Sequence, residues 1–416
     1  MPNILIIAQA APPNGGSHAT RLTYFIKELA ELGWSVEVLT TKIYPGTPLV
    51  DNSMLEDIPG DVSFIRSFPG PLHRWAYRNK KVTNKITKKV TKSGWKKKIL
   101  LPDTYIEWLP YAVSDILFKK KLKQKPDIIL SSAVPYTSHL IALILKKKWN
   151  IPWVADYGDP WVYDPGNPRT GLRYIIEKWL ESMVISNANV ISLTTDTTKE
   201  LYIEKYRIDE NKIKVVPMGF DSKDFIIPEF VNISGKTRFL YTGRLEPESR
   251  DANLFFLALK SLYVKGKLHN CIFEFIGTFH NDIIQLVNNL GLSDIIKFHE
   301  WMDHKECMKY LVTVDFLLLF GNNNNIQIPG KTFNYIGSGT PIIYLSNYEG
   351  ENDPVKKILE DSGLDYWCVD NNQFSIEKIL IEINENYNTS NPKRPDQSYS
   401  WNSRVKDLSC ILKDLL

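Results

Sequence analysis

The chain has 416 residues, of which 43% are hydrophobic and 24% charged, so its composition is that of a globular protein long enough for two domains. The formal charge of +4 is too small to indicate nucleic-acid binding by itself. Four cysteines without Cys-x-x-Cys spacing are typical of a reducing compartment. No run approaches the roughly 18 apolar residues that a membrane span needs, so we expect a cytoplasmic protein.

The first half alternates short apolar runs with segments of helical spacing, which predicts a parallel α/β sheet. Strands are expected at residues 4–8, 36–39, 126–130, 153–155 and 189–193. Between the first two, apolar residues from Leu22 to Leu32 recur at helical spacing, and Gly33 marks the end of that helix. Gly15 and Gly16 lie in the loop before this helix, without the Gly-x-Gly-x-x-Gly fingerprint of dinucleotide sites. By itself the glycine pair favours a tight turn over a ligand-binding loop.

Residues 66–125 are the most basic part of the chain. Two lysine clusters, at residues 80–98 and 119–125, are interleaved with Trp75, Tyr77 and Trp95. Basic residues mixed with interfacial aromatics suit an anionic membrane surface or single-stranded nucleic acid. A solvated lysine-rich face is the simpler alternative.

Two carboxylates follow the strand expected at 153–155, in the sequence Asp-Tyr-Gly-Asp-Pro-Trp that begins at Asp156. Asp156 and Asp159 thus come at the carboxyl end of a strand, where open α/β sheets bind ligands, and one of two close carboxylates can act as a base. Turn formation is the alternative, because Asp and Pro both favour turns. His18 and His139 are further candidates for a base, although a lone histidine is more often structural.

The second half repeats the α/β alternation after a polar linker at residues 221–236. Strands are expected at residues 238–242, 273–276, 296–299, 316–320 and 341–345, and a helix at 401–416. Another helix is expected at 252–265, with Asp251 as its N-cap and Leu254, Leu257, Ala258 and Leu262 on one face. Arg244 and Arg250 flank the loop before this helix, and two such arginines can bind a diphosphate bidentately.

Residues 328–343 predict a loop, a short helix from Lys331 to about Ile336, and a buried strand. Gly337 and Gly339 are expected to end the helix, because glycine enters left-handed conformations readily. A helix N-terminus at the carboxyl end of a sheet attracts anions. The same pattern also fits an ordinary loop-helix-strand connector.

Five separated segments, in this order, resemble those of family 4 glycosyltransferases, which are enzymes of the GT-B fold. They are Pro-Pro-x-Gly-Gly at 12–16, Val-Ala-Asp-x-x-Asp-Pro-Trp at 154–161, Val-Val-Pro-Met-Gly-Phe-Asp at 215–221, Tyr-Thr-Gly-Arg-Leu at 241–245 and the segment from Pro329 to Ile343. The resemblance implies two Rossmann-like α/β/α domains facing across a cleft. We expect an acceptor-binding domain at 1–220, a linker at 221–236, a nucleotide-sugar-binding domain at 237–395, and a C-terminal helix at 396–416 that packs back on the first domain.

The resemblance also implies roles for individual residues. Gly15 and Gly16 would let the first loop approach the anomeric centre, and Asp156 or Asp159 would position or deprotonate the acceptor hydroxyl. On the donor side, Arg244, Arg250 and Lys331 would hold the diphosphate, Asn334 the ribose, and Trp301 and Met302 the base. The chain has no Asp-x-Asp motif, so we expect a nucleotide-sugar co-substrate with no metal ion and no other cofactor.

The chain departs from the family pattern at several positions. Many retaining members carry a Glu-x7-Glu pair, and its two positions fall on Ile326 and Asn334 here. Gly158 stands where relatives usually have Arg, and Met218 where they have Asn. The family suggests retention of anomeric configuration, but Ile326 cannot form a polar contact with the donor sugar.

We therefore expect a glycosyltransferase that moves a sugar from a nucleotide sugar to a saccharide or lipid-linked saccharide, in bacterial surface-polysaccharide biosynthesis. Basic residues within 72–125 would contact the anionic inner face of the cell membrane peripherally, and no nucleic-acid partner is expected. A sugar-nucleotide epimerase and a non-catalytic partner subunit are the alternatives; loss of both glutamates favours the latter.

Overall fold

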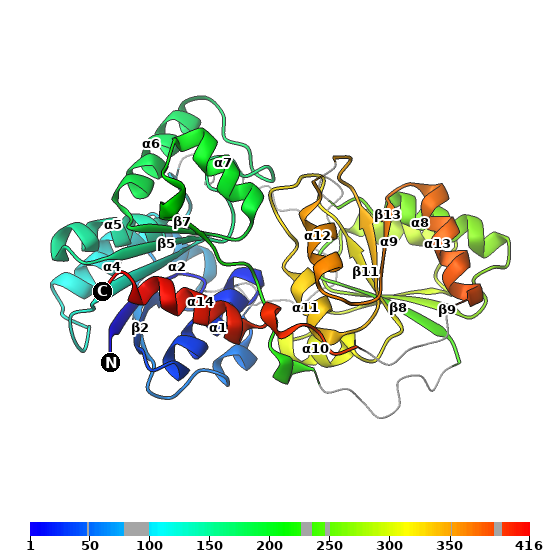
Figure 1. Cartoon of the computed structure of the whole chain (residues 1–416), viewed down its shortest axis with the longest axis horizontal. Helices are drawn as coiled ribbons and strands as arrows, with labels where there is room; N and C mark the ends of the chain where they lie inside the picture. The colour runs from blue at the N-terminus through cyan, green and yellow to red at the C-terminus, as the bar shows by residue number, and fades with distance from the viewer. Residues whose placement is uncertain (48–49, 79–99, 226–234, 246–249, 351, 387–392) are drawn as a thin grey trace. The chain divides into compact units, whose positions relative to one another are not determined.

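The computed structural model describes all residues except 48–49, 79–99, 226–234, 246–249, 351 and 387–392. The chain forms two compact units (Figure 1). The first unit combines the described residues up to Met218 with Trp401–Leu416, and the second comprises those from Gly219 to Ser400.

The first unit contains a seven-stranded parallel sheet with the strand order β3-β2-β1-β4-β5-β6-β7. The strands are β1 (Asn3–Ile7), β2 (Ser35–Thr41), β3 (Ser63–Ser67), β4 (Ile128–Ala133), β5 (Trp153–Tyr157), β6 (Val190–Leu193) and β7 (Ile213–Val215). The described helices are α1 (Ser17–Glu31), α2 (Pro71–Tyr77), α4 (Trp108–Leu117), α5 (Thr137–Trp149), α6 (Gly171–Asn187), α7 (Asp196–Tyr206) and α14 (Trp401–Lys413). The five predicted strands are confirmed, and β3 and β7 extend the sheet at its two edges.

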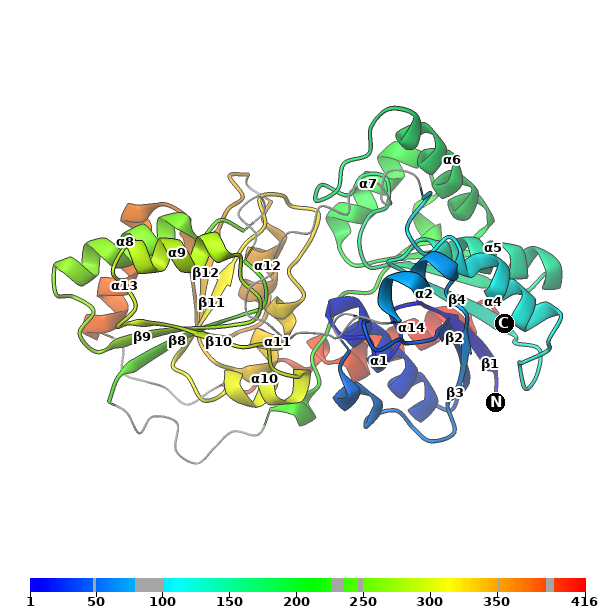
Figure 2. The same ribbon diagram turned by 180° about the vertical axis from the view of Figure 1, so that it is seen from behind.

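Alternating residues of the buried strands divide the first unit into two apolar layers. Ile4 and Ile6 of β1 pack in the layer that contains α1 and α14. Leu5 and Ile7 point the other way, into the layer formed with α4, α5, α6 and α7. Helices cover both faces of the sheet (Figures 1 and 2), which explains why its central strands are apolar throughout.

The last helix, α14, lies beside α1, as the red and blue helices in Figure 1 show. Trp401 stacks on Tyr24 with a centroid distance of 5.3 Å. Trp34 Nε1 donates a hydrogen bond of 2.8 Å to Ser409 Oγ. The prediction that the C-terminal helix returns to the first domain is confirmed.

The second unit has a six-stranded parallel sheet with the order β10-β9-β8-β11-β12-β13. Its strands are β8 (Thr237–Thr242), β9 (Cys271–Ile276), β10 (Ile296–His299), β11 (Phe316–Phe320), β12 (Ile342–Ser346) and β13 (Tyr366–Asp370). Its described helices are α8 (Asn253–Val264), α9 (Asn281–Asn289), α10 (His304–Leu311), α11 (Lys331–Ser338), α12 (Pro354–Asp361) and α13 (Gln373–Asn386). One apolar layer lies with α8, α9 and α13 and the other with α10, α11 and α12, so the predicted α/β/α architecture is confirmed.

Helix α8 corrects two details of the sequence analysis. Its N-cap is Ala252, while Asp251 Oδ1 accepts a hydrogen bond of 2.8 Å from the Asn253 amide one residue into the helix. Leu254 and Leu257 are exposed, and the buried face is formed by Phe255, Phe256, Ala258, Leu259 and Leu262.

Strand order reverses between β1 and β4 in the first sheet and between β8 and β11 in the second. Loops that follow such neighbouring strands diverge to opposite faces of the sheet and leave a crevice at the carboxyl edge, where open α/β proteins bind ligands. These two positions are therefore where the fold favours ligand binding. Within the described ranges, no helix combines the length and apolar character that crossing a bilayer requires.

Candidate functional site

The glycine loop after β1 leads directly into α1. The buried Asn14 side chain donates hydrogen bonds to the carbonyls of Gln9 (3.0 Å) and Ala11 (2.8 Å), which fix the loop. Gly16 has a φ of +96°, and a Cβ added there would meet nothing within 4 Å. Glycine is thus required at Gly16 by its backbone conformation, and its outer side is open.

Asp156 lies inside the first unit and has a structural role. Arg21 Nη2 is 2.7 Å from Asp156 Oδ1, and Arg21 Nε donates to Oδ2 at 3.1 Å. The hydroxyls of Ser132 and Ser192 also donate to this carboxylate, at 2.8 and 2.9 Å. Burial would raise the pKa of Asp156, but the charge and hydrogen bonds of Arg21, together with the two serine hydrogen bonds, outweigh it and hold the pKa below its usual value. A fully buried carboxylate with four donors cannot reach an acceptor hydroxyl, so the role expected for Asp156 is corrected.

Asp159 lies two residues beyond β5, and its side chain faces His18. His18 Nε2 is 3.6 Å from Asp159 Oδ2, and the two side chains are 29% and 33% exposed. Gly158 makes this arrangement possible, because a Cβ at that position would lie 2.5 Å from His18 Nε2. Two of the four candidate bases, His18 and Asp159, are therefore brought together, at the start of α1 and just after β5.

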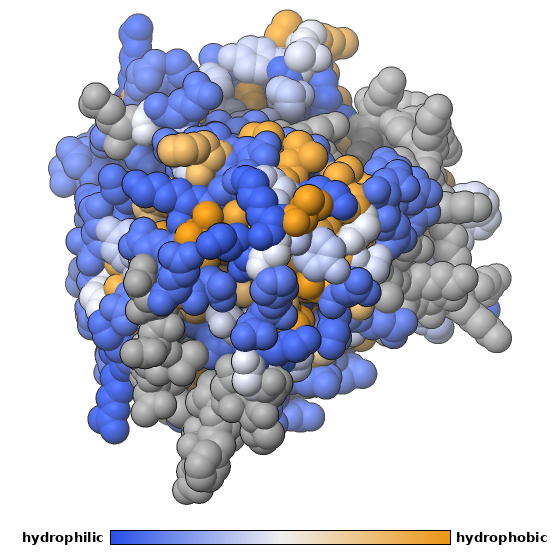
Figure 3. Space-filling view, turned by 90° about the vertical axis from the view of Figure 1, so that its right-hand side faces the viewer, coloured by the Kyte–Doolittle hydropathy of each residue, from blue (hydrophilic) through white to orange (hydrophobic). Residues whose placement is uncertain are grey.

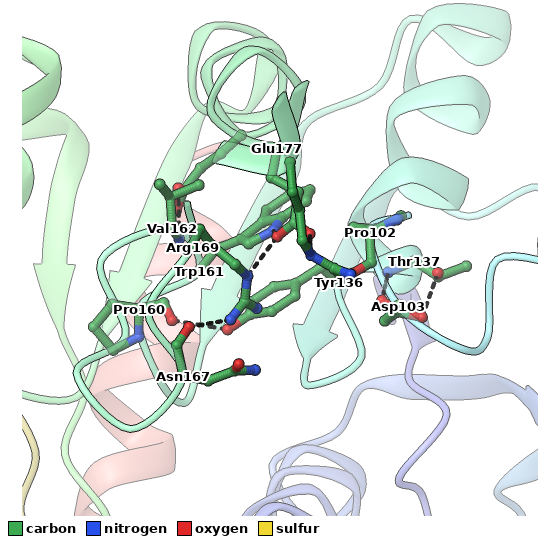
Figure 4. Close-up of polar contacts among 12 residues, drawn as sticks. Pro102, Asp103, Tyr136, Thr137, Pro160, Trp161, Val162, Asn167, Arg169 and Glu177 are labelled. Carbon is green, nitrogen blue, oxygen red and sulfur yellow. Dashed lines mark hydrogen bonds and ion pairs between the residues drawn. The ribbon is translucent and has the colours of Figure 1, made fainter. Parts of the chain in front are cut away.

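The loop that carries Asp159 is held from behind by a buried polar network (Figure 4). Tyr136 donates its hydroxyl hydrogen to the Pro160 carbonyl at 2.8 Å and stacks on Trp161 with a centroid distance of 4.6 Å. Trp161 Nε1 and Arg169 Nε both donate to Glu177 Oε2, at 2.9 and 2.7 Å. No sequence pattern indicated this network, because Glu177 is one charged residue among several in a long helix.

His139 is fully buried in the first unit, where Ser131 Oγ lies 2.7 Å from its Nδ1. Burial lowers the pKa of His139 to about 3. His139 is therefore a neutral core residue, and its candidacy as a base is corrected.

In the second unit, Lys331 opens α11 and reaches the carboxyl end of β8. Its Nζ donates to the Thr242 carbonyl and lies 3.8 Å from the centroid of the Tyr241 ring. One turn later, the hydroxyl of Tyr335 accepts a hydrogen bond of 2.9 Å from the Thr242 amide. These contacts bring the N-terminus of α11 to the place where the strand order reverses.

Two glycines let the strand ends approach one another there. Gly243 has a φ of +107°, and a Cβ on it would lie 2.8 Å from Lys331 Nζ. Gly277, at the end of β9, has a φ of +148°, and its Cβ would lie 2.2 Å from the Gly243 carbonyl oxygen. Gly277 was not singled out from the sequence, because a single glycine after a strand is common.

The two arginines of the loop after β8 differ in their surroundings. Arg250 Nε donates to Asn322 Oδ1 at 2.8 Å, and Asn322 Nδ2 donates to the Gln327 carbonyl at 2.9 Å. Asn322 directly follows Gly321 at the end of β11, so Arg250 is tied to the second strand of the crevice. Arg244 is exposed, and residues 246–249 between them lie outside the described part of the chain.

The glycines of α11 have different roles. Gly339 ends the helix with a φ of +69°, as predicted. Gly337 lies inside the helix, where a Cβ would come within 2.6 Å of the Phe220 and Phe225 rings. Its expected role as a helix stop is corrected: it makes room for packing within the second unit.

The first turns of α11 carry two more polar residues. Asn334 is half-buried, one turn after Lys331. Thr332 is fully buried, and its Oγ1 has no hydrogen-bond partner among the described residues. Thr332 is a candidate that the sequence analysis did not name.

Trp301 and Met302 follow β10, at the edge of the sheet and two strands away from β8. Trp301 is exposed, whereas Met302 packs against the apolar layer of α10 and α11. Both residues thus lie on the same carboxyl edge of the sheet as Lys331. Among the described residues, no interaction joins either of them to Lys331.

Part of the basic stretch lies outside the described residues, including the lysines of 80–98. In the second cluster, Lys119 and Lys121 are each 2.8 Å from a carboxylate oxygen of Asp115. Some of its charge is therefore neutralised within the unit. Within the described ranges, no three His, Cys, Asp or Glu side chains group closely enough to hold a metal ion.

Known structures share this architecture. A sucrose-phosphate synthase from Thermosynechococcus elongatus matches with a TM-score of 0.68 and 16% identity, over 100% of this chain and 98% of that one. A glycosyltransferase from Rickettsia africae matches with 0.63 and 14%, over 100% and 98%. A UDP-GlcNAc 2-epimerase from Methanocaldococcus jannaschii matches with 0.57 and 14%, over the whole of both chains. The fold is therefore that of the GT-B proteins.

The structures are too distant in sequence to indicate a family, but a family model also matches the chain. Residues 16–219 match the family described as "Glycosyl transferase 4-like domain". No curated protein matches the chain. The matched region includes His18, the Arg21–Asp156 pair and Asp159. The match assigns residues 16–219 to the glycosyl transferase 4-like domain family, and together with the GT-B fold of both units it is consistent with a family 4 glycosyltransferase.

Proposed function

We propose that this glycosyltransferase uses a nucleotide sugar bound by its second unit and transfers the sugar to a saccharide or lipid-linked saccharide bound by its first. The observation that carries the proposal is the crevice between β8 and β11. Lys331, at the N-terminus of α11, contacts the end of β8 at Thr242 and Gly243, and Arg250 donates to Asn322 just after β11.

The chemistry of this crevice suits a diphosphate. Lys331 and Arg250 are held by contacts to opposite strands of the crevice, and the exposed Arg244 adds a third positive charge. The positive end of the α11 dipole, at Lys331, adds to this attraction for anions. Fixed positive groups stabilise the charge that develops on a departing diphosphate, so these residues would act mainly in the transition state. Asn334 and the Thr332 hydroxyl, which has no hydrogen-bond partner in the described part of the chain, would bind ribose or phosphate oxygens.

The acceptor side of the reaction would use the His18–Asp159 pair. An acceptor hydroxyl oxygen forms a bond to the anomeric carbon while the bond from that carbon to the diphosphate oxygen breaks. The electron pair leaves with the diphosphate, and the hydroxyl proton would go to His18, with Asp159 stabilising the resulting positive charge. Gly16 would leave room for the donor sugar.

Calorimetric titration of UDP, GDP, dTDP and CMP into the protein tests the donor site. We expect one nucleotide to bind with micromolar affinity. Arg244→Ala should weaken it tenfold or more, which corresponds to about 1.4 kcal/mol. Arg394→Ala removes another exposed arginine of the same unit and should leave the affinity unchanged.

Failure of all four nucleotides to bind would overturn the donor site and favour a non-catalytic subunit. The absence of glutamate at Ile326 and Asn334 is the sequence feature that favours this alternative. Equal weakening by Arg244→Ala and Arg394→Ala would mean that net charge, rather than a defined site, attracts the nucleotide.

An epimerase is the second candidate, because a structure of UDP-GlcNAc 2-epimerase in complex with UDP-GlcNAc and UDP also matches the whole chain, with a TM-score of 0.51 and 14% identity. An epimerase would convert the nucleotide sugar with no acceptor present. Incubation with the nucleotide sugar alone, followed by NMR of the product, distinguishes the two reactions.

We further propose a role in bacterial surface-polysaccharide biosynthesis, with retention of anomeric configuration and without a metal ion. A lipopolysaccharide outer core galactosyltransferase is among the structures of similar fold, with a TM-score of 0.51 and 16% identity. Basic residues within 72–125 would contact the inner face of the cell membrane. Transfer that continues in excess EDTA would support the metal-independent mechanism, and NMR of the new linkage would establish its stereochemistry.

A further inference from the structure

Helix α6 presents an apolar stripe to solvent. Leu172, Ile175 and Trp179 are 71%, 63% and 60% exposed. Their spacing of three and four residues places them on one face, opposite the buried Glu177, Glu181 and other inward residues of the helix. Single exposed apolar residues are ordinary, but three on one helix face, one of them Trp, form a surface that needs a partner.

The charges of α6 are sorted between its two faces. Both of its acidic residues, Glu177 and Glu181, are fully buried. Glu177 is paired with Arg169 and Arg173, at 2.7 and 2.5 Å. The remaining charged residue of the helix is Lys178, beside the stripe, where its Nζ donates to the Tyr174 hydroxyl at 3.2 Å.

Further cations stand at the C-terminal end of the helix. Lys212 Nζ donates to the Ser186 carbonyl at 3.3 Å, and Lys146 Nζ donates to Asn189 Oδ1 at 2.7 Å. The outer side of α6 thus combines an apolar stripe, an aromatic residue and positive charge, with its own carboxylates turned inward.

We propose that the outer face of α6 docks on an anionic lipid bilayer, with Leu172, Ile175 and Trp179 inserted at the level of the headgroups. An amphipathic helix with a cationic border is the form that binds at such an interface, and Trp is favoured there. The positive charge of this face favours an anionic lipid surface over a second copy of the chain as its partner, because two copies of the face would bring their lysines together. Arg173 of α6 donates to the Pro102 carbonyl at 2.7 Å, so the helix begins beside the basic stretch, but the three stripe residues are not part of that stretch. The proposal does not depend on the proposed donor site.

The second unit offers a contrast and a control. Its face in Figure 3 also has exposed apolar side chains, but hydrophilic residues separate them. Phe374 of α13, in the same unit, is 78% exposed. An exposed aromatic side chain alone is therefore not what distinguishes α6.

The test is cosedimentation of the full chain with vesicles of equimolar phosphatidylglycerol and phosphatidylcholine. We expect binding that Leu172→Ser, Ile175→Ser and Trp179→Ser together weaken tenfold or more, about 1.4 kcal/mol. Phe374→Ser should bind like the unaltered protein. Lys178→Glu alone should weaken binding to these vesicles and leave any weak binding to pure phosphatidylcholine unchanged.

The replaced side chains are exposed, so the triple variant should keep its melting temperature and its nucleotide affinity. Retained vesicle binding by a folded triple variant would overturn the proposal and assign membrane binding to the basic stretch. A dimer in light scattering that the triple variant abolishes, without vesicle binding by the unaltered protein, would also overturn it. If no variant bound nucleotide, the proposed donor site would be wrong, but the vesicle-binding result for the α6 face would still stand.

Discussion

Arg21 and Asp156 form a two-pronged ion pair inside the first unit, although 135 residues separate them in the chain. The pair joins α1 to β5, and Arg21 Nη1 also donates to the Pro217 carbonyl at 3.0 Å. It thereby fixes the start of α1, where His18 lies, relative to the strand that leads to Asp159.

Arg21→Met should destabilise the first unit by about 3–5 kcal/mol, because it leaves a buried carboxylate without its cation. Urea unfolding monitored by circular dichroism measures the change. Arg74→Met, at an exposed position of α2, should cost no more than about 0.5 kcal/mol. An equally small loss for Arg21→Met would show that the pair is not what holds α1 to β5.

Gly158→Ala should displace the His18 ring, because the added Cβ would lie 2.5 Å from Nε2. We expect the transfer rate to fall tenfold or more while the nucleotide affinity stays within about twofold, since the donor residues belong to the other unit. Steady-state kinetics and calorimetry separate the two effects. Gly166→Ala in the same loop, where the nearest atom would be 3.3 Å from the Cβ, serves as the control. Unchanged transfer by Gly158→Ala would exclude His18 from the reaction.

Gly277→Ala should move the loop that carries Gly243 and Arg244, because its Cβ would lie 2.2 Å from the Gly243 carbonyl oxygen. We expect nucleotide affinity to fall tenfold or more in calorimetry. Gly363→Ala also places alanine at a positive φ, of +69°, but meets no atom within 4 Å. Gly363→Ala should lower the stability of the protein through backbone strain without weakening nucleotide binding. Similar affinities for both variants would mean that the β8 loop does not contribute to binding.

Glu181 should give the first unit a measurable pH dependence. Burial raises the pKa of Glu181 from 4.5 to about 7, although hydrogen bonds from Tyr202 and Tyr206 oppose this. Between these values the folded state keeps a proton that the unfolded state has lost, so stability falls as the pH rises. The free energy of unfolding, relative to Glu181→Gln, should drop by an amount on the order of 3 kcal/mol from pH 4 to 8.

Thermal or urea unfolding of both proteins across this range measures the difference. Glu200→Gln, at an exposed position of α7, should follow the unaltered protein at every pH. A stability difference between the unaltered protein and Glu181→Gln that does not change with pH would rule out the buried proton.

The sequence alone determined the two α/β halves and most of their strands. Central strands such as β1 and β11 are buried on both sides and therefore appear as continuous apolar runs. The strands that were missed, β3, β7 and β13, are edge strands with polar or half-buried residues, and such runs resemble loops. The helix ends at Gly33 and Gly339 were also predictable, because a positive φ favours glycine.

Only the tertiary structure decided which polar residues of the candidate site are available for chemistry. The sequence indicated that Asp156 and Asp159 both follow a strand. In the structure β5 extends to Tyr157, so Asp156 is buried within the strand and Asp159 lies beyond its end. Likewise, the contacts of Gly158 with His18 and of Gly277 with Gly243 join segments far apart in the chain. Local patterns report burial and turn formation, whereas the pairing of charges and the space around a glycine depend on which distant segments pack together.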